Sequence, residues 1–431
     1  MIDPFTAAIC IIFLLALFGL SIGLAMICGS ITYLGLKGYD TSIAAETLLQ
    51  GLFNSYTLLA IPLFILAADI MNIGTLADRL LKFSQALVGR YRGGLGHVNV
   101  VSSLIFSGMS GSAVADAVGM GRIIINLMQK DGKYPKSYAA AITAASATIG
   151  PIIPPSIPMV LYALVSDTSI GYLFAAGIAP GLLMGLVLMV MNAMISRRRN
   201  YPVDEAVPLA ALPGVTFRAI PALLLPVILL GGIYGGIMTP TEAAAIAALY
   251  ALVISTVLYR SVTPGQIYTT LLNSARSTIS VGTLIAGALT FHYVVTRENV
   301  PNSIAAYMGQ FDLSPIGFLL AINVLFLIMG CIIETGAILL IVVPVFIPTV
   351  LALGIDPVHF GVVVVVNAML GLITPPYGLL LFIVAGITKE PLKAIIRDLL
   401  PFILALVVAL TIITLVPDFV LFVPRLLGYK G

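Results

Sequence analysis

The chain has 431 residues, of which 60% are hydrophobic and only 9% are charged, and its mean hydropathy is +1.12. Water-soluble domains carry about 25% charged residues, so this composition excludes a soluble globular protein and predicts an integral membrane protein in a lipid bilayer. The 21 Lys and Arg against 18 Asp and Glu leave a net charge of only +3, which excludes the basic footprint of a nucleic-acid-binding protein.

The first 94 residues are expected to supply scaffold helices. Residues 5–36 are apolar for long enough to span a bilayer as one tilted helix, and the run is too long for the core of a signal peptide, so a retained first span is expected. A second apolar run covers 58–71, where Pro62 is expected to kink the helix. Residues 75–92 alternate Leu and Phe with Asp, Lys and Arg at helical spacing, which indicates a helix lying along the membrane interface.

Residues 95–128 are apolar except around the sequence SGMSGSAVAD at 107–116. Ser and Gly at this density do not favour a continuous spanning helix. We expect two half-length helices that meet at a tip and return to the side from which they entered, which is a re-entrant hairpin. The alternative is a helix-packing face of the GxxxG kind. A counterpart in the second half covers 315–353 and is broken around Gly330 and Glu334.

Two motifs, GPIIPPS at 150–156 and GLITPPY at 371–377, interrupt apolar helical runs. Pro lacks a backbone donor and clashes with the preceding turn, and each unpaired backbone group costs several kcal/mol in lipid. Each break is therefore expected to be buried in protein or to line a polar cavity. Breaks of this kind near the membrane midplane are typical of the binding sites of secondary transporters.

The two motifs begin at positions 150 and 371, and we call the difference between these positions, 221, the repeat offset. Seven pairs of Gly, Pro or polar positions share it: Gly150 and Gly371, Pro154 and Pro375, Pro155 and Pro376, Pro180 and Pro401, Ser146 and Asn367, Ser156 and Tyr377, and Tyr138 and His359. An ordered set of this kind predicts an internal duplication. In the hairpins, Gly108 and Gly330 differ by 222 instead, which a single insertion between the hairpin and the broken helix would produce.

Loop charges test the direction of the two repeats, because cytoplasmic loops carry an excess of Lys and Arg. The loops at 130–136, 197–199 and 389–397 carry such residues and are assigned to the cytoplasm. The turns at Asp167 and 354–357 have no Lys or Arg and are assigned to the outside. This assignment requires an inverted second repeat, since a parallel repeat would place 389–397 outside.

The expected architecture is an all-α membrane protein with two re-entrant hairpins and two broken helices in inverted repeats. Its predicted parts are N-terminal scaffold helices with an interfacial arm (1–94), a first transport repeat of hairpin, broken helix and following span (95–195), a cytoplasmic linker (196–217), second scaffold helices with an interfacial arm (218–313), and a second transport repeat with the C-terminal helix (314–431). The remaining expected elements are spans near 218–236, 241–259 and 277–296, an amphipathic stretch at 262–276, and a last crossing at 391–423.

Five runs carry a family resemblance: YRGGLGHVNVVSSLIFSGMSGSAVADAVGMGR (91–122), AAITAASATIGPIIPPSIPMVLYA (140–163), GIAPG (177–181), PTEAAAIAALYAL (240–252) and GIDPVHFGVVVVVNAMLGLITPPYG (354–378). They resemble the large membrane (M, DctM-like) subunit of TRAP (tripartite ATP-independent periplasmic) transporters, and the resemblance covers essentially the whole chain. It implies an elevator-type transporter of the ion transporter superfamily, energised by a sodium gradient, in a bacterial or archaeal inner membrane. The hairpins and broken helices, 95–165 and 314–388, would move as one body against the other helices.

The resemblance also implies two protein partners. These are a small four-helix membrane subunit and a soluble periplasmic substrate-binding protein that delivers a small organic acid anion. Members of the family take C4-dicarboxylates, sugar acids or sialic acids, so the substrate stays open within these classes. A channel and an intramembrane enzyme are the alternatives. The chain has no HExxH or paired-Asp motif, no catalytic residue is expected, and paired broken helices favour a discrete bound state over an open pore.

Two Na⁺ sites are expected at the hairpin tips and the breaks. Na⁺ is a hard cation that needs several oxygen ligands, and the free carbonyls of a helix break together with nearby hydroxyls supply them. The resemblance places the sites at the same elements. The candidate ligands are Ser107, Gly108, Ser110, Ser112, Gly150, Ile153 and Ser156 in the first half, and Gly330, Gly371, Thr374 and Tyr377 in the second. The Gly, Ile and Tyr residues would act through their main-chain carbonyls.

Charged residues within apolar runs are functional candidates, because a charge at mid-membrane costs at least ~2.5 kcal/mol. Asp116 and Arg122 are candidates for lining the substrate site or its cavity, with a structural ion pair or a position at the membrane interface as the alternatives. Glu334 either balances a cation or faces water. The full set of candidate substrate contacts is Ser110, Ser112, Asp116, Arg122, Pro154, Glu334 and Pro375.

Overall fold

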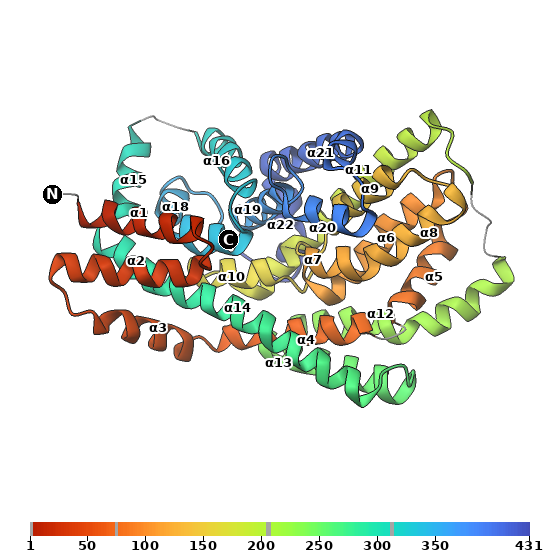
Figure 1. Ribbon diagram of the computed structural model, residues 1–431, viewed down its shortest axis with the longest axis horizontal. Coiled ribbons are helices and arrows are strands. Elements are labelled where there is room, and N and C mark those ends of the chain that lie inside the picture. The colour runs from red at the N-terminus through yellow and green to blue at the C-terminus, as the bar shows by residue number, and fades with distance from the viewer. Residues whose placement is uncertain (1–2, 74–75, 204–207, 311–313) are drawn as a thin grey trace.

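The computed structural model describes residues 3–73, 76–203, 208–310 and 314–431, and within these ranges the chain forms helices and no β-strand. Seven of the described helices are long and apolar enough to cross a membrane. Figure 1 shows helices from both halves of the chain packed side by side in an elongated molecule. The prediction of an all-α integral membrane protein is confirmed.

The N-terminal region contains α1 (Pro4–Leu17), α2 (Ile22–Lys37), α3 (Ser42–Asn54), η1 (Tyr56–Leu59), α4 (Ala60–Ile73) and α5 (Leu76–Val88). The single span predicted over 5–36 is wrong. The chain turns at Gly19, whose φ of 88° favours glycine, and α2 packs back against α1. Pro62, at which a kink is predicted, lies in the first turn of α4, directly after η1. The helix predicted within 75–92 is present as α5, and residue 75 lies outside the described residues.

Two helical legs meet at a tip in the first half. They are α6 (Gly94–Ser110) and the run of α7 (Ala113–Asp116), η2 (Ala117–Gly121) and α8 (Arg122–Gln129), and the legs contact each other. At the tip Gly111 has a φ of 59°, and the Ser112 hydroxyl accepts a hydrogen bond from the Ala115 amide at 3.3 Å. This bond caps the start of α7. The interruption predicted at 107–116 is confirmed, and one continuous GxxxG-type helix is excluded.

The second half repeats this arrangement with α16 (Pro315–Gly330), α17 (Thr335–Ala337), η6 (Ile338–Val342) and α18 (Val343–Ala352). Both second legs contain a π-helical segment, and the first residues of these segments, Ala117 and Ile338, are related by the repeat offset. The insertion predicted between hairpin and broken helix is therefore wrong. The two halves differ in the turn at the tip, which covers 111–112 in the first half and 331–334 in the second.

Both predicted helix breaks are confirmed. The first separates α9 (Lys136–Ala147) from α10 (Ile157–Ser166), the second separates α19 (Pro357–Gly371) from α20 (Leu379–Thr388), and each contains a cis Pro–Pro peptide bond. The helices that follow are α11 (Ile170–Arg198), α21 (Leu392–Leu415) and α22 (Pro417–Leu426). The single last crossing predicted over 391–423 is wrong, because α21 ends before Val416, and Pro417 disfavours a helical conformation of the residue that precedes it.

Two hydrogen bonds show that the broken helices run in opposite directions. The Ser137 hydroxyl at the start of α9 donates to Asp398 near the start of α21 at 2.7 Å, and the Tyr162 hydroxyl near the end of α10 donates to the Pro357 carbonyl at the start of α19 at 2.6 Å. Hence α19 begins where α10 ends, and α21, which follows α20, begins where α9 begins. The inverted repeat is confirmed.

A pair of matching contacts supports the same symmetry. The Tyr138 hydroxyl on α9 donates to Asn192 of α11, and His359 on α19 places its Nε2 atom 2.9 Å from the Ile413 carbonyl of α21. Both members of the second pair are related to those of the first by the repeat offset. Each repeat therefore joins its broken helix to its following span at the same two positions.

We call the end of the bundle at which α9 and α21 begin the basic end. The loops rich in Lys and Arg lie there, at 130–136, 197–199 and 389–397, and Arg199 forms an ion pair with Asp398 at 2.7 Å. The end at which α10 ends and α19 begins is the opposite end. By the positive-inside rule the basic end faces the cytoplasm.

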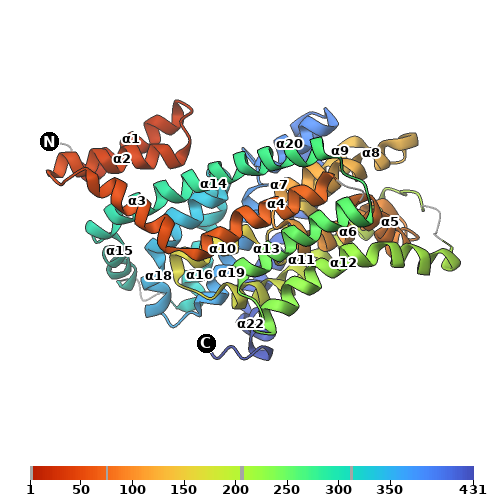
Figure 2. The same ribbon diagram turned by 90° about the horizontal axis from the view of Figure 1, so that it is seen from below.

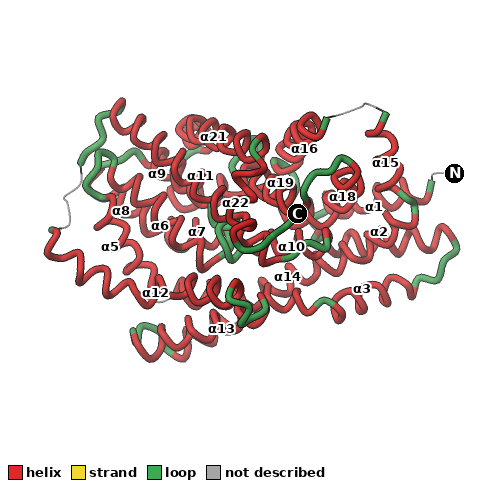
Figure 3. Tube along the Cα trace, turned by 180° about the vertical axis from the view of Figure 1, so that it is seen from behind, coloured by secondary structure: helices red, strands yellow, loops and turns green. Residues whose placement is uncertain are grey.

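The region predicted to form the second set of scaffold helices contains α12 (Leu212–Tyr234), α13 (Pro240–Val253), η5 (Ile254–Leu258), α14 (Pro264–Arg297) and α15 (Val300–Gly309). Figures 1 and 2 show α12, α13 and α14 beside α4 along one long side of the molecule. Figure 3 shows α9, α11, α19 and α21 grouped away from that layer. The site elements are therefore bordered on one side by the scaffold helices.

Two boundaries in this region differ from the prediction. The amphipathic stretch at 262–276 and the span at 277–296 form one helix of 34 residues, α14, because no Pro interrupts it after its first residue. The predicted linker over 196–217 is shorter, because α11 continues to Arg198 and α12 begins at Leu212. Residues 204–207 of that linker lie outside the described residues.

Candidate functional site

The first hairpin tip lies directly on the first helix break. A Cβ atom added to Gly111 would lie 2.5 Å from the Pro155 carbonyl oxygen, and one added to Gly150 would lie 3.2 Å from the Ser112 carbonyl oxygen. Main chain therefore meets main chain here, with no room for a side chain between them. We call this the first tip–break contact.

The second tip and break meet through two glycines. A Cβ atom on Gly371 would lie 2.6 Å from the Gly330 Cα atom, and one on Gly330 would lie 3.0 Å from the Gly371 Cα atom. This is the second tip–break contact. In both halves the structure brings together tip and break residues that the sequence predicted as Na⁺ ligands, although they are about 40 positions apart in the chain.

The other predicted residues of the first half lie around the same contact. Gly108 faces Pro226 of α12, and a Cβ atom on it would lie 3.9 Å from the Pro154 carbonyl oxygen. Pro154 itself is buried. Ile153 is partly buried and its side chain lies against Gly181 of α11. The carbonyl groups of the break are thus held in place by packing on both sides.

The four predicted serines differ in how far their hydroxyls are already engaged. Three make local hydrogen bonds: Ser107 donates to the Ser103 carbonyl at 2.5 Å, Ser112 accepts from the Ala115 amide at 3.3 Å, and Ser156 accepts from the Met159 amide at 3.2 Å and donates to the Pro151 carbonyl. The Ser110 hydroxyl is buried and has no hydrogen-bond partner among the described residues. A buried hydroxyl without a partner costs free energy, so a ligand at Ser110 would satisfy it.

A network of side-chain hydrogen bonds holds α6 against α9. The Asn99 amide donates to the Thr143 hydroxyl at 2.7 Å, the Ser146 hydroxyl donates to the Asn99 side-chain oxygen at 2.9 Å, and the Ser103 hydroxyl donates to the Ser146 hydroxyl at 3.1 Å. All four residues are buried. This network fixes the first leg of the hairpin to the broken helix, so the tip and the break are positioned together.

The second half uses an amide pair for the same purpose. The Asn367 amide on α19 donates to the side-chain and main-chain oxygens of Asn323 on α16, at 2.9 Å each. Asn367 and Ser146 are related by the repeat offset, so the two halves place a polar residue at equivalent positions. The sequence analysis paired these positions but assigned them no role. Their signal was a polar residue inside an apolar run at the repeat offset.

The second break is more open than the first. The Thr374 hydroxyl donates a hydrogen bond to the Leu370 carbonyl at 2.7 Å. The lone pairs of the Thr374 hydroxyl oxygen therefore stay free to coordinate a cation. Pro375 is partly buried, and Tyr377 is 60% exposed with its ring centroid 5.3 Å from that of Phe382. The two tip–break contacts therefore offer different sets of oxygens.

Of the three charged candidates, only Asp116 lies inside the protein. It is 1% exposed, and neither carboxylate oxygen has a hydrogen-bond partner among the described residues. Arg122 is exposed and forms no ion pair with Asp116, so the structural ion pair is excluded. Glu334 is exposed at the start of α17.

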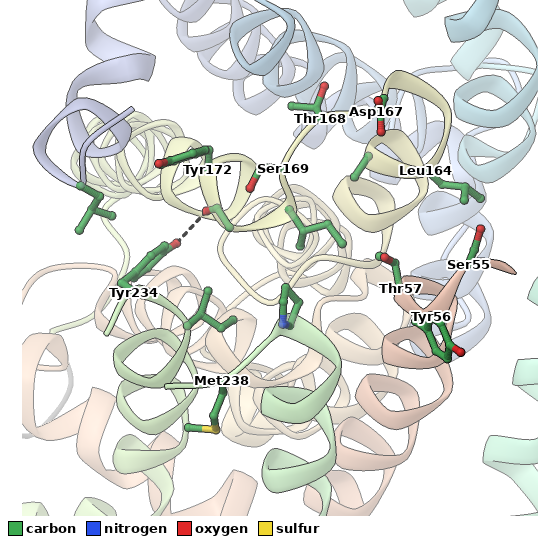
Figure 4. A pocket seen from close by; sticks show the side chains of 16 residues that line it. Ser55, Tyr56, Thr57, Leu164, Asp167, Thr168, Ser169, Tyr172, Tyr234 and Met238 are labelled. Atoms are coloured by element: carbon green, nitrogen blue, oxygen red, sulfur yellow. Dashed lines mark hydrogen bonds between the residues drawn. The ribbon is translucent and has the colours of Figure 1, made fainter. Parts of the chain in front are cut away.

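A separate cavity of about 730 Å³ lies at the opposite end (Figure 4). It is bordered by the turn between α10 and α11, by η1, and by the end of α12, and it includes polar side chains such as Asp167, Thr168 and Thr57. The Tyr234 hydroxyl donates to the Gly171 carbonyl across it at 3.2 Å. None of the predicted site residues lines this cavity, and no motif in the sequence indicated it.

Comparison with known proteins adds the family. The family model described as "Tripartite ATP-independent periplasmic transporter, DctM component" matches residues 9–419. The chain is 41% identical over 421 residues to the sialic acid TRAP transporter large permease protein SiaM of Vibrio cholerae, covering 95% of this chain and 96% of that relative. It is 42% identical over 399 residues to the C4-dicarboxylate TRAP transporter large permease protein DctM of Pseudomonas aeruginosa, covering 93% and 91%.

A solved structure shares the fold at low sequence identity. The crystal structure of the Alcanivorax borkumensis YdaH transporter matches with a TM-score of 0.66 and 18% identity, over 86% of this chain and 88% of that one. At this identity the likeness concerns the fold alone.

Proposed function

The chain belongs to the DctM family, the large permease component of tripartite ATP-independent periplasmic (TRAP) transporters, and from this premise we propose that it imports an organic acid anion by using a sodium gradient. It is a multi-pass inner-membrane protein, and its relatives are transporter subunits and not enzymes. The substrate would belong to the class of C4-dicarboxylates, sugar acids or sialic acids. A soluble periplasmic protein would deliver it, and a small membrane subunit would complete the permease.

The two tip–break contacts carry the proposal of sodium coupling. Each brings the main chain of a helix break against that of a hairpin tip, inside a chain that spans a membrane. Unpaired carbonyls and hydroxyls at such a place suit a hard monovalent cation. One Na⁺ would bind at each contact, with Ser110 as the most available hydroxyl in the first half and Thr374 in the second. The buried carboxylate of Asp116 lies one turn beyond the first tip and would balance positive charge there.

The arrangement of the hairpins supports an elevator mechanism. The first hairpin begins at Gly93, whose carbonyl accepts from Asn192 near the basic end of α11 at 3.3 Å, and α8 ends next to the loop at 130–136 at that same end. Both of its legs would thus enter from the cytoplasmic side, as expected for a re-entrant hairpin. In this proposal 95–165 and 314–388 move as one body against scaffold helices within 1–94 and 218–313, with the linker at 196–217 joining the halves.

The whole function depends on partners, and this can be tested directly. Proteoliposomes that contain the chain, the small membrane subunit and the binding protein are expected to take up the organic acid in a saturable manner when a sodium gradient is imposed. The chain alone should show no uptake above empty liposomes, because the described helices include no soluble capture domain for the substrate. Uptake by the isolated chain, or flux that does not saturate, would point instead to a self-sufficient carrier or a channel.

Sodium affinity should depend on the hydroxyls at both contacts. Loss of one ligand is worth ~1–2 kcal/mol, so Thr374→Val and Ser110→Ala are each expected to raise the half-saturating sodium concentration roughly ten-fold. Substrate affinity should weaken too, because coupling between two binding sites is reciprocal. The measurement is the initial uptake rate of the reconstituted complex against sodium concentration.

Thr411→Val is the matched control for these variants. Its hydroxyl also donates to the carbonyl four residues earlier, at 2.8 Å, but it is exposed on α21 and distant in sequence from the breaks. It should leave the sodium dependence unchanged. An unaltered half-saturating concentration in both Thr374→Val and Ser110→Ala would sink the assignment of sodium to these contacts.

A further inference from the structure

A cleft of about 290 Å³ lies where α5 crosses the beginning of α12, and its charges do not serve the proposed transport site. It is lined by Asp78, Arg79 and Lys82 of α5 and by Val215 and Arg218 of α12. Three cationic side chains therefore face one carboxylate. Among the described residues, Lys82 and Arg218 form no ion pair. We call this the basic cleft.

An aromatic ring orients one of the cationic side chains of the basic cleft, that of Arg79. The Arg79 guanidinium lies 3.7 Å from the centroid of the Tyr259 ring, and the Tyr259 hydroxyl donates to the main-chain carbonyl of Arg218 at 3.0 Å. Tyr259, which follows η5, thus joins the end of that segment to α5 and α12 at one point. A cation–π contact orients a guanidinium without neutralising its charge, so the cleft is preorganised for an anion.

The cleft lies at the basic end of the molecule. α12 starts there, and Tyr234 at its far end bonds to Gly171 at the start of α11, which belongs to the opposite end. α5 precedes Gly93, which also lies at the basic end, next to Asn192. By the positive-inside rule the cleft therefore faces the cytoplasmic leaflet of the membrane.

An exposed apolar stripe runs along α12 away from the cleft. It consists of side chains that repeat at helical spacing: Phe217, Ile220, Leu224 and Val227. Ten residues of helix rise about 15 Å, which is half of a hydrocarbon core of about 30 Å and hence the depth of one leaflet. At about 100° per residue, this stripe lies on the side of α12 away from Val215 and Arg218, so it marks the depth at which α12 enters the hydrocarbon core. The cleft at the beginning of the helix is therefore placed at the level of the lipid head groups, where its charge is complementary to an anionic head group.

We propose that the basic cleft binds the phosphate head group of an anionic phospholipid from the cytoplasmic leaflet, whose acyl chains extend into the hydrocarbon core beside it. Basic pockets between membrane helices on the cytoplasmic side recognise such head groups by charge. Arg79 supplies a fixed, planar donor set to the phosphate, while Lys82 and Arg218 add charge from both walls of the cleft. The bound lipid would anchor α5 to the scaffold layer at the interface.

Native mass spectrometry of the permease, co-purified with its small membrane subunit, tests this. The protein is exchanged into mixtures of phosphatidylglycerol and phosphatidylcholine with identical acyl chains. We expect a preference for phosphatidylglycerol of about ten-fold or more, and Lys82→Gln with Arg218→Gln should reduce that preference by about ten-fold. This pair leaves the Arg79–Tyr259 contact intact, and neither side chain forms a described ion pair whose loss would unfold the protein.

The control pair is Lys393→Gln with Arg397→Gln, which removes the same charge at the basic end from two exposed residues of α21. It should keep the lipid preference. Equal retention of both lipids, or a preference that the cleft variant does not change, overturns the proposal. Displacement of the lipid by millimolar inorganic phosphate would reassign the cleft to free anions. Retention by the isolated chain but not by the assembled permease would reassign it to the small subunit.

Discussion

A disulfide between positions 72 and 119 is expected to stop transport completely in the cross-linked molecules. A Cβ atom on Gly119 would lie 3.0 Å from the Cγ atom of Asn72, so the Cβ atoms of the two positions are within the ~3.5–4.5 Å that a disulfide requires. Asn72 belongs to α4, one of the proposed scaffold helices, and Gly119 belongs to the second leg of the first hairpin. A covalent bond between them would prevent any displacement of the hairpin along the scaffold.

The measurement is uptake by the reconstituted complex carrying Asn72→Cys and Gly119→Cys in a background without Cys10, Cys28 and Cys331, the natural cysteines. Oxidation should reduce uptake to the level of the molecules that remain uncross-linked, and reduction should restore it.

The matched control is Gly232→Cys with Met238→Cys. A Cβ atom on Gly232 would lie 3.5 Å from the Met238 Cγ atom, and both positions belong to the scaffold. Oxidation of this pair should leave uptake intact. Full transport by a completely oxidised 72–119 pair would contradict the movement of the hairpins against the scaffold.

Gly371→Ala should strongly damage the second tip–break contact. Its Cβ atom would overlap the main chain of Gly330, which no rotamer change can relieve, because the obstacle is backbone. Forcing atoms into a packed core costs about 1–3 kcal/mol. Separation of the second tip from its break is therefore expected to weaken apparent sodium affinity by roughly ten- to one-hundred-fold and to lower the uptake rate accordingly.

Two further glycine substitutions test whether the loss of sodium affinity follows the degree of steric overlap. Gly330→Ala should have a smaller effect, since its Cβ atom would lie 3.0 Å from Gly371. Gly386→Ala on α20 should have none, because nothing lies within 4 Å of its Cβ position. Thermal unfolding of each purified variant separates loss of the contact from loss of the fold. The proposal requires the order Gly371→Ala, Gly330→Ala, Gly386→Ala in sodium affinity, and equal affinities in the three would refute it.

The sequence by itself determined the features that depend on local chemistry. Gly and Pro act on the backbone of their own turn, so the breaks at 150–156 and 371–377 and the interruption at 107–116 were predictable from residue type alone. The repeat followed from the spacing of the motifs. Its inversion followed from the placement of Lys and Arg in loops, because charged side chains are excluded from lipid in any membrane fold.

Helix boundaries within apolar runs were beyond the sequence. Residues 5–36 are uniformly apolar, yet they form two helices, whereas 262–296 changes from amphipathic to apolar and forms one helix from residue 264 onward. In a membrane protein both lipid and neighbouring helices accept apolar side chains, so hydrophobicity does not report where a helix turns back. Packing of α2 on α1, and of α14 on α2 and α4, decided these boundaries.

The tertiary structure alone decided which candidates share a site. Sequence spacing equated Gly150 with Gly371, but only folding could place Gly371 against Gly330, since contact between main chains depends on how a hairpin packs on a broken helix. Asp116 and Arg122 looked alike in the sequence, as charges in one apolar run, and folding buried the first and exposed the second. The difference arises because a helix presents each face to a different neighbour, and a single sequence does not specify those neighbours.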